Sequence, residues 1–176
     1  MIHPPRGPCP HPAELAAETL LRECAERRLR RSGPGGQNRN KVETAVVLLH
    51  KPTGIEAEAN ERRSQAENRQ VALFRLRLKL AVQVRTKRDP ATTPSELWKS
   101  RCRAGRLAVN PNHADFPAIL AEALNVLALN DFDTGPAAKA LGCSASQLVK
   151  LLKDEPRAFE LFNRERFSRS RPRLSR

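Results

Sequence analysis

The chain has 176 residues, of which 32 are Lys or Arg and 19 are Asp or Glu, so its formal net charge at pH 7 is +13. This length predicts one medium domain or a small domain with appendages, and the excess of positive charge is typical of proteins that bind nucleic acid or an anionic membrane. No apolar run approaches the ~20 residues of a membrane span, and the N-terminal stretch MIHPPRGPCPHP lacks the apolar core of a secretory signal.

The cysteines and histidines of the chain are scattered, and no pair of cysteines has the C-x-x-C spacing of a metal site or redox motif. The four cysteines are Cys9, Cys24, Cys102 and Cys143. We therefore expect free thiols in a reducing cytosol, no metal and no cofactor. The protein is expected to be cytoplasmic and monomeric, with no membrane partner.

Charge divides the chain into parts. Residues 1–90 carry 18 basic and 10 acidic residues, residues 106–163 carry 5 basic and 7 acidic residues, and residues 164–176 carry 6 arginines and 1 glutamate. A near-neutral, apolar module therefore separates two basic ends. We expect a disordered, proline-rich lead at 1–12, a first domain at 13–90, a helical module at 91–163 and a basic disordered tail at 164–176.

The first ninety residues predict a small antiparallel sheet. AELAAETLLR (13–22) is helix-permissive, and a strand is expected at about 24–30, before the glycine-rich stretch. VETAVVLLH (42–50) is rich in β-branched residues and predicts a strand. KPTG predicts a tight turn, and IEAEA alternates in polarity as a further strand does. The last two strands would form a hairpin.

The segment ERRSQAENRQVALFRLRLKLAVQVRTK predicts one long helix, with Ser64 as N-cap and Glu67 completing a capping box. Helical spacing places the expected core stripe at Val71, Phe74, Leu78 and Val82, widened by Leu73, Leu76 and Leu80. The side chains expected outside or along the edges are Arg69, Arg75, Arg77 and Lys79. The fold class predicted for this part is therefore α+β, a small antiparallel sheet packed by one long helix.

Beyond the linker-like RDPATTP, the sequence predicts an all-helical module, with helices at about 95–104, 116–129, 136–142, 145–153 and 156–166. Within it, PAAKALGCSASQLVKLLKDEP has the pattern of a helix-turn-helix. The expected core positions are Ala137, Ala138, Leu141, Leu148, Leu151 and Leu152, with Gly142 in the turn, Ser144 or Ser146 as cap, and Gln147, Lys150 and Lys153 on the outer face. Two interpretations stay open: a helix that reads nucleic acid, or a helical hairpin whose lysines are only solvated.

The stretch RSGPGGQNRN (31–40) places three glycines and a proline directly before Gln37. It could form a hairpin turn, a phosphate-binding loop, or a loop that carries backbone N–H groups and one side chain into a crowded polar pocket. The spacing does not match the P-loop or G-x-G-x-x-G. Gln37 cannot act as a general base, because a primary amide does not titrate near neutral pH. Its contribution must be positional: its side chain can place a water, or its backbone N–H can stabilise an oxyanion, which is worth ~3 kcal/mol per donor.

RSGPGGQNRNKVETAV, followed by HKPTGIEAEANERRSQAENRQVALFRLRLKLA, resembles the catalytic domain of class-I peptide chain release factors. The resemblance covers residues 30–85 and extends beyond the Gly-Gly-Gln tripeptide. The further matching residues are Asn40, Lys41, Thr44-Ala45-Val46, His50-Lys51-Pro52-Thr53-Gly54, Arg63-Ser64-Gln65 and Asn68. Pro34 and Arg39 depart from the family pattern, in which alanine and valine are usual at these two positions.

This resemblance implies that the glycine loop enters the peptidyl-transferase centre of the large ribosomal subunit and promotes hydrolysis of the peptidyl-tRNA ester. The catalytic residues would be Gly35, Gly36 and Gln37, with Gln37 also a candidate for N-methylation by a glutamine methyltransferase. The glycines would hold the backbone shape, the Gln37 N–H would stabilise the oxyanion or the leaving ribose hydroxyl, and its side chain would orient water. The expected RNA-binding residues are Arg30, Arg31, Arg39, Asn40, Lys41, Arg63, Ser64, Gln65, Asn68, Arg164, Arg166, Arg169, Arg171 and Arg173.

Decoding members of the family carry an N-terminal helical domain and a stop-codon-reading domain with a tripeptide such as P-x-T or S-P-F, and we expect neither domain before residue 30 or after residue 90. The chain therefore resembles the short, codon-independent ribosome-rescue factors, whose basic C-terminal extension lies in the empty mRNA channel of the small subunit. RERFSRSRPRLSR would take that place through phosphate contacts. Here, however, residues 91–163 intervene where those factors have a flexible linker. The alternative is a non-catalytic RNA- or DNA-binding protein that uses the helix-turn-helix-like region.

Overall fold

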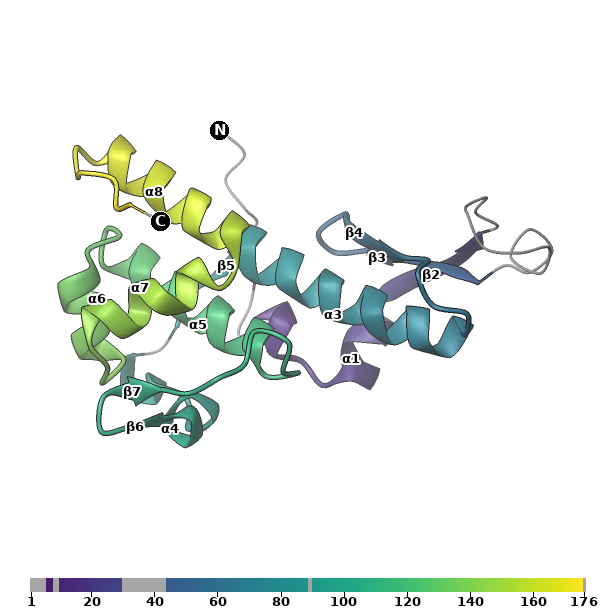
Figure 1. Cartoon of the computed structure of the whole chain (residues 1–176), viewed down its shortest axis with the longest axis horizontal. Coiled ribbons are helices and arrows are strands. Elements are labelled where there is room, and N and C mark those ends of the chain that lie inside the picture. The colour runs from purple at the N-terminus through teal and green to yellow at the C-terminus, as the bar shows by residue number, and fades with distance from the viewer. Residues whose placement is uncertain (1–5, 8–9, 30–43, 89, 176) are drawn as a thin grey trace. The chain divides into compact units, whose positions relative to one another are not determined.

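The structure is a computed structural model that describes residues 6–7, 10–29, 44–88 and 90–175 (Figure 1). The chain forms two compact units, one of Leu15–Leu80 and one of Met1–Glu14 together with Ala81–Arg176. The division falls inside the long helix α3 (Gln65–Gln83), whereas we expected a domain boundary at residue 90. No helix among the described residues combines the length and the apolar character needed to cross a membrane.

A three-stranded antiparallel sheet, with strand order β2-β3-β4, forms the core of the Leu15–Leu80 unit. Strand β3 (Ala45–His50) lies between β2 (Cys24–Leu29) and β4 (Ile55–Ala59), and all of its residues except Leu49 are buried. A central strand buried in this way requires the apolar, β-branched run found in its sequence. Helix α1 (Ala17–Arg22) precedes β2. The predicted antiparallel sheet is thus confirmed.

The β3–β4 turn is held by a buried histidine. The His50 ring nitrogens lie 2.9 Å from the Glu23 carboxylate (Nε2 to Oε2) and 2.7 Å from the Thr53 hydroxyl (Nδ1 to Oγ1). Gly54 has a φ of +69°, in the left-handed region that favours glycine. The chain can therefore reverse sharply at this point, and the paired strands stay in register.

Helix α3 is confirmed as the longest helix of the described residues, but it buries a different face from the one we expected. The fully buried positions in its first four turns are Asn68, Ala72, Leu76 and Leu80, which follow an i, i+4 spacing. The expected stripe of Val71, Phe74, Leu78 and Val82 is only half-buried. The buried residues of β4, Ala57 and Ala59, are small, and the buried face of α3 likewise includes the small residue Ala72.

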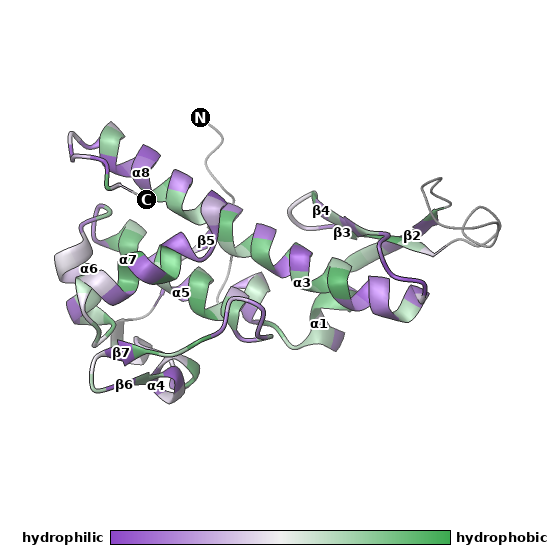
Figure 2. Ribbon diagram, viewed as in Figure 1, coloured by the Kyte–Doolittle hydropathy of each residue, from purple (hydrophilic) through white to green (hydrophobic). Residues whose placement is uncertain are grey.

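The second unit is built around α5 (Phe116–Leu129), which is buried at every position from Phe116 to Leu127. Figure 2 shows this helix largely in the green of hydrophobic residues. The surrounding elements are β1 (Arg6–Gly7), η1 (Pro12–Glu14), β5 (Arg85–Thr86), η2 (Pro90–Thr92), α4 (Glu96–Arg101), β6 (Cys102–Arg103), β7 (Arg106–Leu107), α6 (Thr134–Ala140), α7 (Ala145–Lys153) and α8 (Pro156–Ser168). The predicted helix spans 116–129 and 145–153 are confirmed.

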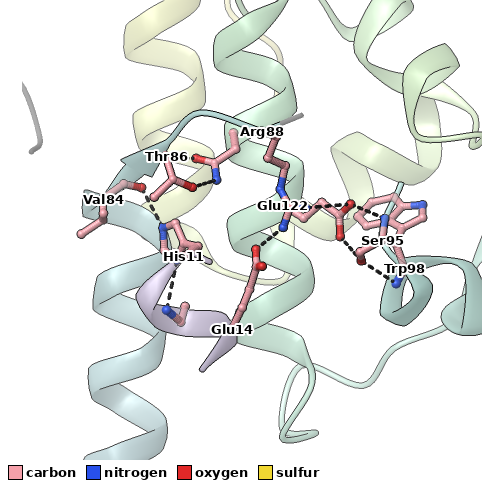
Figure 3. A network of polar contacts seen from close by, with 10 residues as sticks. His11, Glu14, Val84, Thr86, Arg88, Ser95, Trp98 and Glu122 are labelled. Carbon is pink, nitrogen blue, oxygen red and sulfur yellow. Dashed lines mark hydrogen bonds and ion pairs between the residues drawn. The ribbon is translucent and has the colours of Figure 1, made fainter. Parts of the chain in front are cut away.

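The N-terminal lead, which we expected to be disordered as far as residue 12, is built into this unit where the structure describes it. Strand β1 pairs in parallel with β5. The His11 ring is fully buried, accepts the Ala13 N–H at Nδ1 (3.0 Å), and lies 3.1 Å from the Val84 carbonyl at Nε2 (Figure 3). Because Nδ1 accepts, Nε2 carries the proton and donates. Burial lowers the pKa of His11 to about 4, so the ring is neutral at pH 7.

A buried ion cluster joins η1, α5 and the segment after β5. The Arg88 guanidinium contacts the carboxylates of Glu14 and Glu122, and only 7% of the Arg88 side chain is exposed. Glu122 also accepts hydrogen bonds from the backbone N–H (2.7 Å) and the hydroxyl of Ser95, which in turn caps α4 at the Trp98 N–H (Figure 3). Burial raises the pKa of Glu14, and the Arg88 charge opposes that rise. The paired charges thus fasten the N-terminal segment to the helical unit.

Helices α6 and α7 form the predicted helix–turn–helix. Gly142 in the turn has a φ of +64°, and the Ser144 hydroxyl accepts the Gln147 N–H as the α7 N-cap (3.2 Å). The six expected core residues, Ala137, Ala138, Leu141, Leu148, Leu151 and Leu152, are all buried. The local arrangement is confirmed, while its role is not decided by the fold alone.

The C-terminal residues form an ordered end to the unit, which corrects the expectation of a disordered tail from residue 164. Helix α8 continues to Ser168, and the chain then folds back, so that the Asn163 side chain accepts the Leu174 N–H (2.8 Å) and donates to the Leu174 carbonyl (3.0 Å). Arg171 pairs with Asp133 at 2.7 Å. The segment is ordered because its arginines find partners within the unit, which a charge count cannot reveal.

Candidate functional site

The segment that carries the Gly-Gly-Gln tripeptide connects two strands whose ends are fixed to each other. Leu29, the last residue of β2, pairs with Ala45, the first residue of β3. The expected catalytic residues Gly35, Gly36 and Gln37 lie between these ends and outside the described residues. The same holds for Arg30, Arg31, Arg39, Asn40 and Lys41. The structure therefore defines the base from which the segment starts and to which it returns.

The side chain of Asn68, on α3, binds the backbone at Thr44, the residue directly before β3. Its side-chain amide donates to the carbonyls of Thr44 (2.7 Å) and Arg62 (3.0 Å), and its Oδ1 accepts the Arg62 N–H (2.9 Å). The Asn68 side chain is fully buried. We expected Asn68 to bind RNA; instead, it joins the residue before β3 to the chain that enters α3. Any effect of Asn68 on the site is therefore a positioning effect.

The expected RNA-binding residues Arg63, Ser64 and Gln65 lie at the start of α3, beside this junction. Ser64 caps the helix by accepting the Glu67 N–H at 3.4 Å, as predicted, although it is exposed. Arg63 is exposed and has no ion pair among the described residues. Since Asn68 binds both Thr44 and Arg62, Arg63 presents a positive charge close to the base of the 30–43 segment.

The arginines farther along the sheet are largely paired with carboxylates. Glu26 accepts from Arg69 at 2.7 Å and lies 3.5 Å from Arg28, and Arg27 pairs with Glu56 at 3.0 Å. These pairs are exposed, so each contributes at most about 1 kcal/mol to stability. They offset part of the positive charge around β2, whereas Arg63 has no ion pair among the described residues.

The C-terminal arginines that we expected to bind RNA divide into two groups. Arg166 is buried and donates to the carbonyls of Phe132 (3.1 Å) and Pro172 (3.0 Å), so it holds the chain end in place. Arg169 pairs with Glu165 at 2.7 Å, and Arg171 pairs with Asp133 as described above. The guanidinium groups of Arg166, Arg169 and Arg171 therefore all make hydrogen bonds or ion pairs within the unit.

The second group is exposed. Arg164 has no ion pair among the described residues. The Arg173 guanidinium lies 4.8 Å from the centre of the Phe167 ring, and Phe167 is itself exposed. Only these two of the five arginines in the described tail remain available to a partner without breaking a hydrogen bond or ion pair of the unit.

Three features of the described residues were not anticipated from sequence. The first is the positioning role of Asn68, and the second is the burial of His11. The third is Pro90-Ala91-Thr92, which has the P-x-T form of a decoding tripeptide, while the predicted lack of a stop-codon-reading domain stays a prediction. It forms the 3-10 helix η2, in which Ala91 and Thr92 are exposed. This tripeptide can be found in the sequence itself, because it lies inside RDPATTP, the stretch that we interpreted as a linker.

The described residues contain no cluster of His, Cys, Asp or Glu side chains that could hold a metal ion. The three described cysteines, Cys24, Cys102 and Cys143, are free thiols. Burial raises the pKa of Cys143 to about 11, so this thiol is protonated at neutral pH and is a poor nucleophile. Within the part of the chain that the structure describes, thiol and metal chemistry therefore have no evident site.

Comparison with known proteins places the 30–43 segment in a family context. A family model described as the RF-1 domain matches residues 18–108. The chloroplastic peptide chain release factor PrfB1 of Arabidopsis thaliana is 55% identical over 53 residues, which are 30% of this chain and 12% of the relative. Peptide chain release factor 1 of Chlorobaculum tepidum is 48% identical over 67 residues, 38% of this chain and 18% of the relative. The mitochondrial peptide chain release factor 1 of Bos taurus is 37% identical over 75 residues, 43% of this chain and 17% of the relative.

An α+β unit whose β2–β3 connection carries Gly-Gly-Gln has the organisation expected of a release-factor catalytic domain. Because the RF-1 domain model matches more than half of the 176 residues, the chain belongs to the class-I peptide chain release factor family. It spans less than a fifth of the length of the relatives named above. Its own activity, substrate and partners are therefore matters for proposal.

Proposed function

We propose that this protein hydrolyses the ester of ribosome-bound peptidyl-tRNA in the peptidyl-transferase centre, without reading a stop codon, and so rescues stalled ribosomes. The observation that carries the proposal is the Gly35-Gly36-Gln37 tripeptide in a segment whose two ends are fixed by the Leu29–Ala45 pair and by Asn68. Family membership supports the reaction class.

In the proposed mechanism, Gln37 acts without titrating. Water attacks the ester carbonyl carbon, and the Gln37 backbone N–H stabilises the oxyanion or the ribose hydroxyl that leaves. The Gln37 side-chain amide orients the attacking water. A preorganised donor of this kind is worth ~3 kcal/mol, about a hundredfold in rate. Gly35 and Gly36 have no Cβ, so the backbone can approach the substrate closely.

Positive charge supports the proposed partners, the large-subunit ribosomal RNA and the peptidyl-tRNA. Four basic residues flank the tripeptide in sequence, namely Arg30, Arg31, Arg39 and Lys41, and Arg62 and Arg63 precede α3, where Asn68 joins Arg62 to Thr44. Guanidinium groups suit phosphate because their planar fork donates two hydrogen bonds at once. We also propose Gln37 as a substrate for a glutamine methyltransferase, by its place in the family motif. The mRNA channel of the small subunit is a further proposed partner, which the tail would contact through its exposed arginines Arg164 and Arg173.

A second candidate function is favoured by one observation. Pro90-Ala91-Thr92 has the P-x-T form that codon-reading members of this family carry, and it forms the 3-10 helix η2. On that account, release would require a stop codon in the ribosomal A site, and Thr92 would contribute to it.

One assay separates the two functions. Peptide release is measured from ribosome complexes on truncated mRNA and from matched complexes that present a stop codon or a sense codon. We expect release on truncated mRNA, with no stimulation by the stop codon, and we expect Thr92→Ala to release at the wild-type rate. Release that needs the stop codon and drops in the Thr92→Ala variant would establish codon reading instead.

A further inference from the structure

A short β-hairpin (β6 and β7) is joined to the helix–turn–helix of the second unit at two points, and the preceding helix α4 is joined to it at a third. The Gln147 side chain on α7 accepts the Leu107 N–H of β7 at 3.3 Å. The Cys102 thiol of β6 lies 3.7 Å from the Gly142 carbonyl in the turn. The Trp98 indole N–H donates to the Leu141 carbonyl at 2.8 Å. The hairpin, the turn and the first turn of α7 are therefore held in a fixed arrangement, which Figure 1 shows for β6, β7 and α7.

The tip of this hairpin carries two exposed arginines. Arg103 and Arg106 are partners in the β6–β7 register, and both side chains are exposed. Between them, Ala104 and Gly105 have φ angles of +49° and +74°, which close the strands in a tight turn. Cross-strand partners lie on the same face of a hairpin, so the two guanidinium groups present one doubly charged tip.

The helix–turn–helix adds lysines to the same region. Lys150 is exposed on α7, one turn beyond the exposed Ser146, and Lys139 is exposed at the end of α6 beside the turn. We call Arg103, Arg106, Lys139 and Lys150 the hairpin–helix surface. None of the four has an ion pair with any described residue.

Acidic residues are missing from the segments that form this surface. Residues 101–112 contain three arginines and no Asp or Glu, and residues 134–153 contain three lysines and no Asp or Glu. The module as a whole is slightly acidic over 106–163, so positive charge is concentrated here while negative charge lies elsewhere. Such segregation is the electrostatic footprint of a surface that meets phosphates.

We propose that the hairpin–helix surface is a second RNA-binding site, distinct from the Gly-Gly-Gln segment, and that it binds the phosphate backbone of double-stranded RNA. The partner is double-stranded because the surface segments, 101–112 and 134–153, contain no Phe, Trp or Tyr on which unpaired bases could stack. Helical RNA is recognised chiefly by its shape and its phosphates, which is what separated, rigidly held cations can contact. RNA is favoured over DNA because the chain belongs to a release-factor family.

The test measures the affinity of the full-length protein for an RNA duplex of about 16 base pairs by fluorescence anisotropy, across a series of salt concentrations. The test variant is Arg103→Glu with Arg106→Glu. The matched control is Lys87→Glu with Arg157→Glu, which makes the same change in charge at two exposed residues of the same unit. A third variant, Arg103→Lys with Arg106→Lys, keeps the charge. All comparisons are repeated with Arg30→Glu and Arg31→Glu in the background, so that binding by the Gly-Gly-Gln segment does not hide the effect.

The test variant should bind the duplex at least ~10-fold more weakly than wild type, with the slope of log K against log salt reduced by about 2. The control variant should stay within about twofold of wild type, and the lysine variant should keep most of the affinity. Thermal unfolding should be unchanged for all three, since the substituted side chains are exposed. Equal weakening by the control, tighter binding to single-stranded RNA or to a DNA duplex, or no duplex binding by wild type would each overturn the proposal.

Discussion

Asn68 is the buried residue that joins Thr44, directly before β3, to Arg62, shortly before α3. Its three hydrogen bonds, at 2.7, 2.9 and 3.0 Å, join Thr44 and Arg62 through a fully buried amide. Removing this amide leaves part-buried backbone groups of Thr44 and Arg62 without these partners, and an unpaired group costs about 1–3 kcal/mol where it is buried. We therefore expect Asn68→Ala to lower the free energy of unfolding by ~2–4 kcal/mol, measured by urea denaturation.

A helix residue of similar chemistry provides the control. Gln70 is exposed two residues further along α3, so Gln70→Ala should change the free energy of unfolding by less than about 0.5 kcal/mol. If Asn68→Ala were as mild as Gln70→Ala, the junction between Thr44 and Arg62 would not be what fixes the base of the segment.

His11 gives the unfolding free energy a predictable pH dependence. Burial lowers its pKa from 6.5 to about 4 in the folded protein, so between these two values the unfolded chain binds the proton more readily. Stability is therefore full above pH 6.5 and falls as the pH drops toward 4, by up to ~3 kcal/mol from this residue. Below about pH 4 both states bind the proton and this contribution no longer changes.

The measurement compares urea denaturation of wild type and His11→Gln at a series of pH values. Glutamine retains an amide that can donate to the Val84 carbonyl but does not titrate. The wild-type curve should lose stability faster than the variant between pH 6.5 and 4, and the two should run parallel above pH 7. Parallel curves throughout would mean that His11 takes up its proton in the folded protein as readily as in the unfolded chain.

At the scale of the element, the end of α8 is where sequence and structure differ most. Residues 170–175 supply the Pro172 carbonyl to the buried Arg166, the Arg171 partner of Asp133, and the Leu174 N–H and carbonyl that bind the Asn163 side chain. Ending the chain after Arg169 removes all of these. We expect the unfolding free energy to fall by ~2–4 kcal/mol and the midpoint of thermal unfolding to fall by roughly 4–16 °C.

The control for this truncation is Arg164→Ala, which alters an exposed arginine of α8 with no described ion pair. It should leave the midpoint unchanged within about 1 °C. A truncated chain that unfolds at the wild-type temperature would show that the tail does not stabilise the unit, as the sequence-based expectation of a disordered tail implies.

The helices differ in how well their spans and buried faces could be predicted from their own sequences. The spans of α5 and α7 followed from apolar periodicity and from Ser144 as an N-cap, because both signals are local. The buried face of α3 did not follow, since the side chains at Val71, Phe74, Leu78 and Val82 are as apolar as those at the buried positions Leu76 and Leu80, and burial is decided by tertiary packing. Local patterns therefore predicted where helices begin and end better than they predicted which side is buried.

At the scale of the whole molecule, contacts between remote segments were what sequence patterns could not supply. His11 and Val84 are separated by 73 residues, and Arg88 and Glu14 by 74. Both contacts place the N-terminal segment in the same unit as Ala81–Arg176, whereas composition alone suggested a disordered lead. The family motif behaved differently, because its residues 30–68 are close together in sequence and could be matched without knowledge of the fold.

The proposed ester hydrolysis and the proposed second RNA contact belong to different units of the protein. The Leu15–Leu80 unit fixes the ends of the Gly-Gly-Gln segment, and the second unit carries the hairpin–helix surface. Under these proposals, the residues that promote hydrolysis and the residues of the further RNA contact lie in two different compact units. Loss of the hairpin–helix surface would then weaken RNA binding while the Gly-Gly-Gln segment keeps its residues.

The central claim is that Gln37 promotes ester hydrolysis by position, and it is tested most directly by peptide release from ribosomes stalled on truncated mRNA. Gln37→Pro removes the backbone N–H and should lower the release rate about 100-fold, whereas Gln70→Ala, a glutamine change on the exposed side of α3, should release at the wild-type rate. If Gln37→Pro released peptide as fast as the Gln70→Ala control, the proposed role of Gln37 in catalysis would be contradicted.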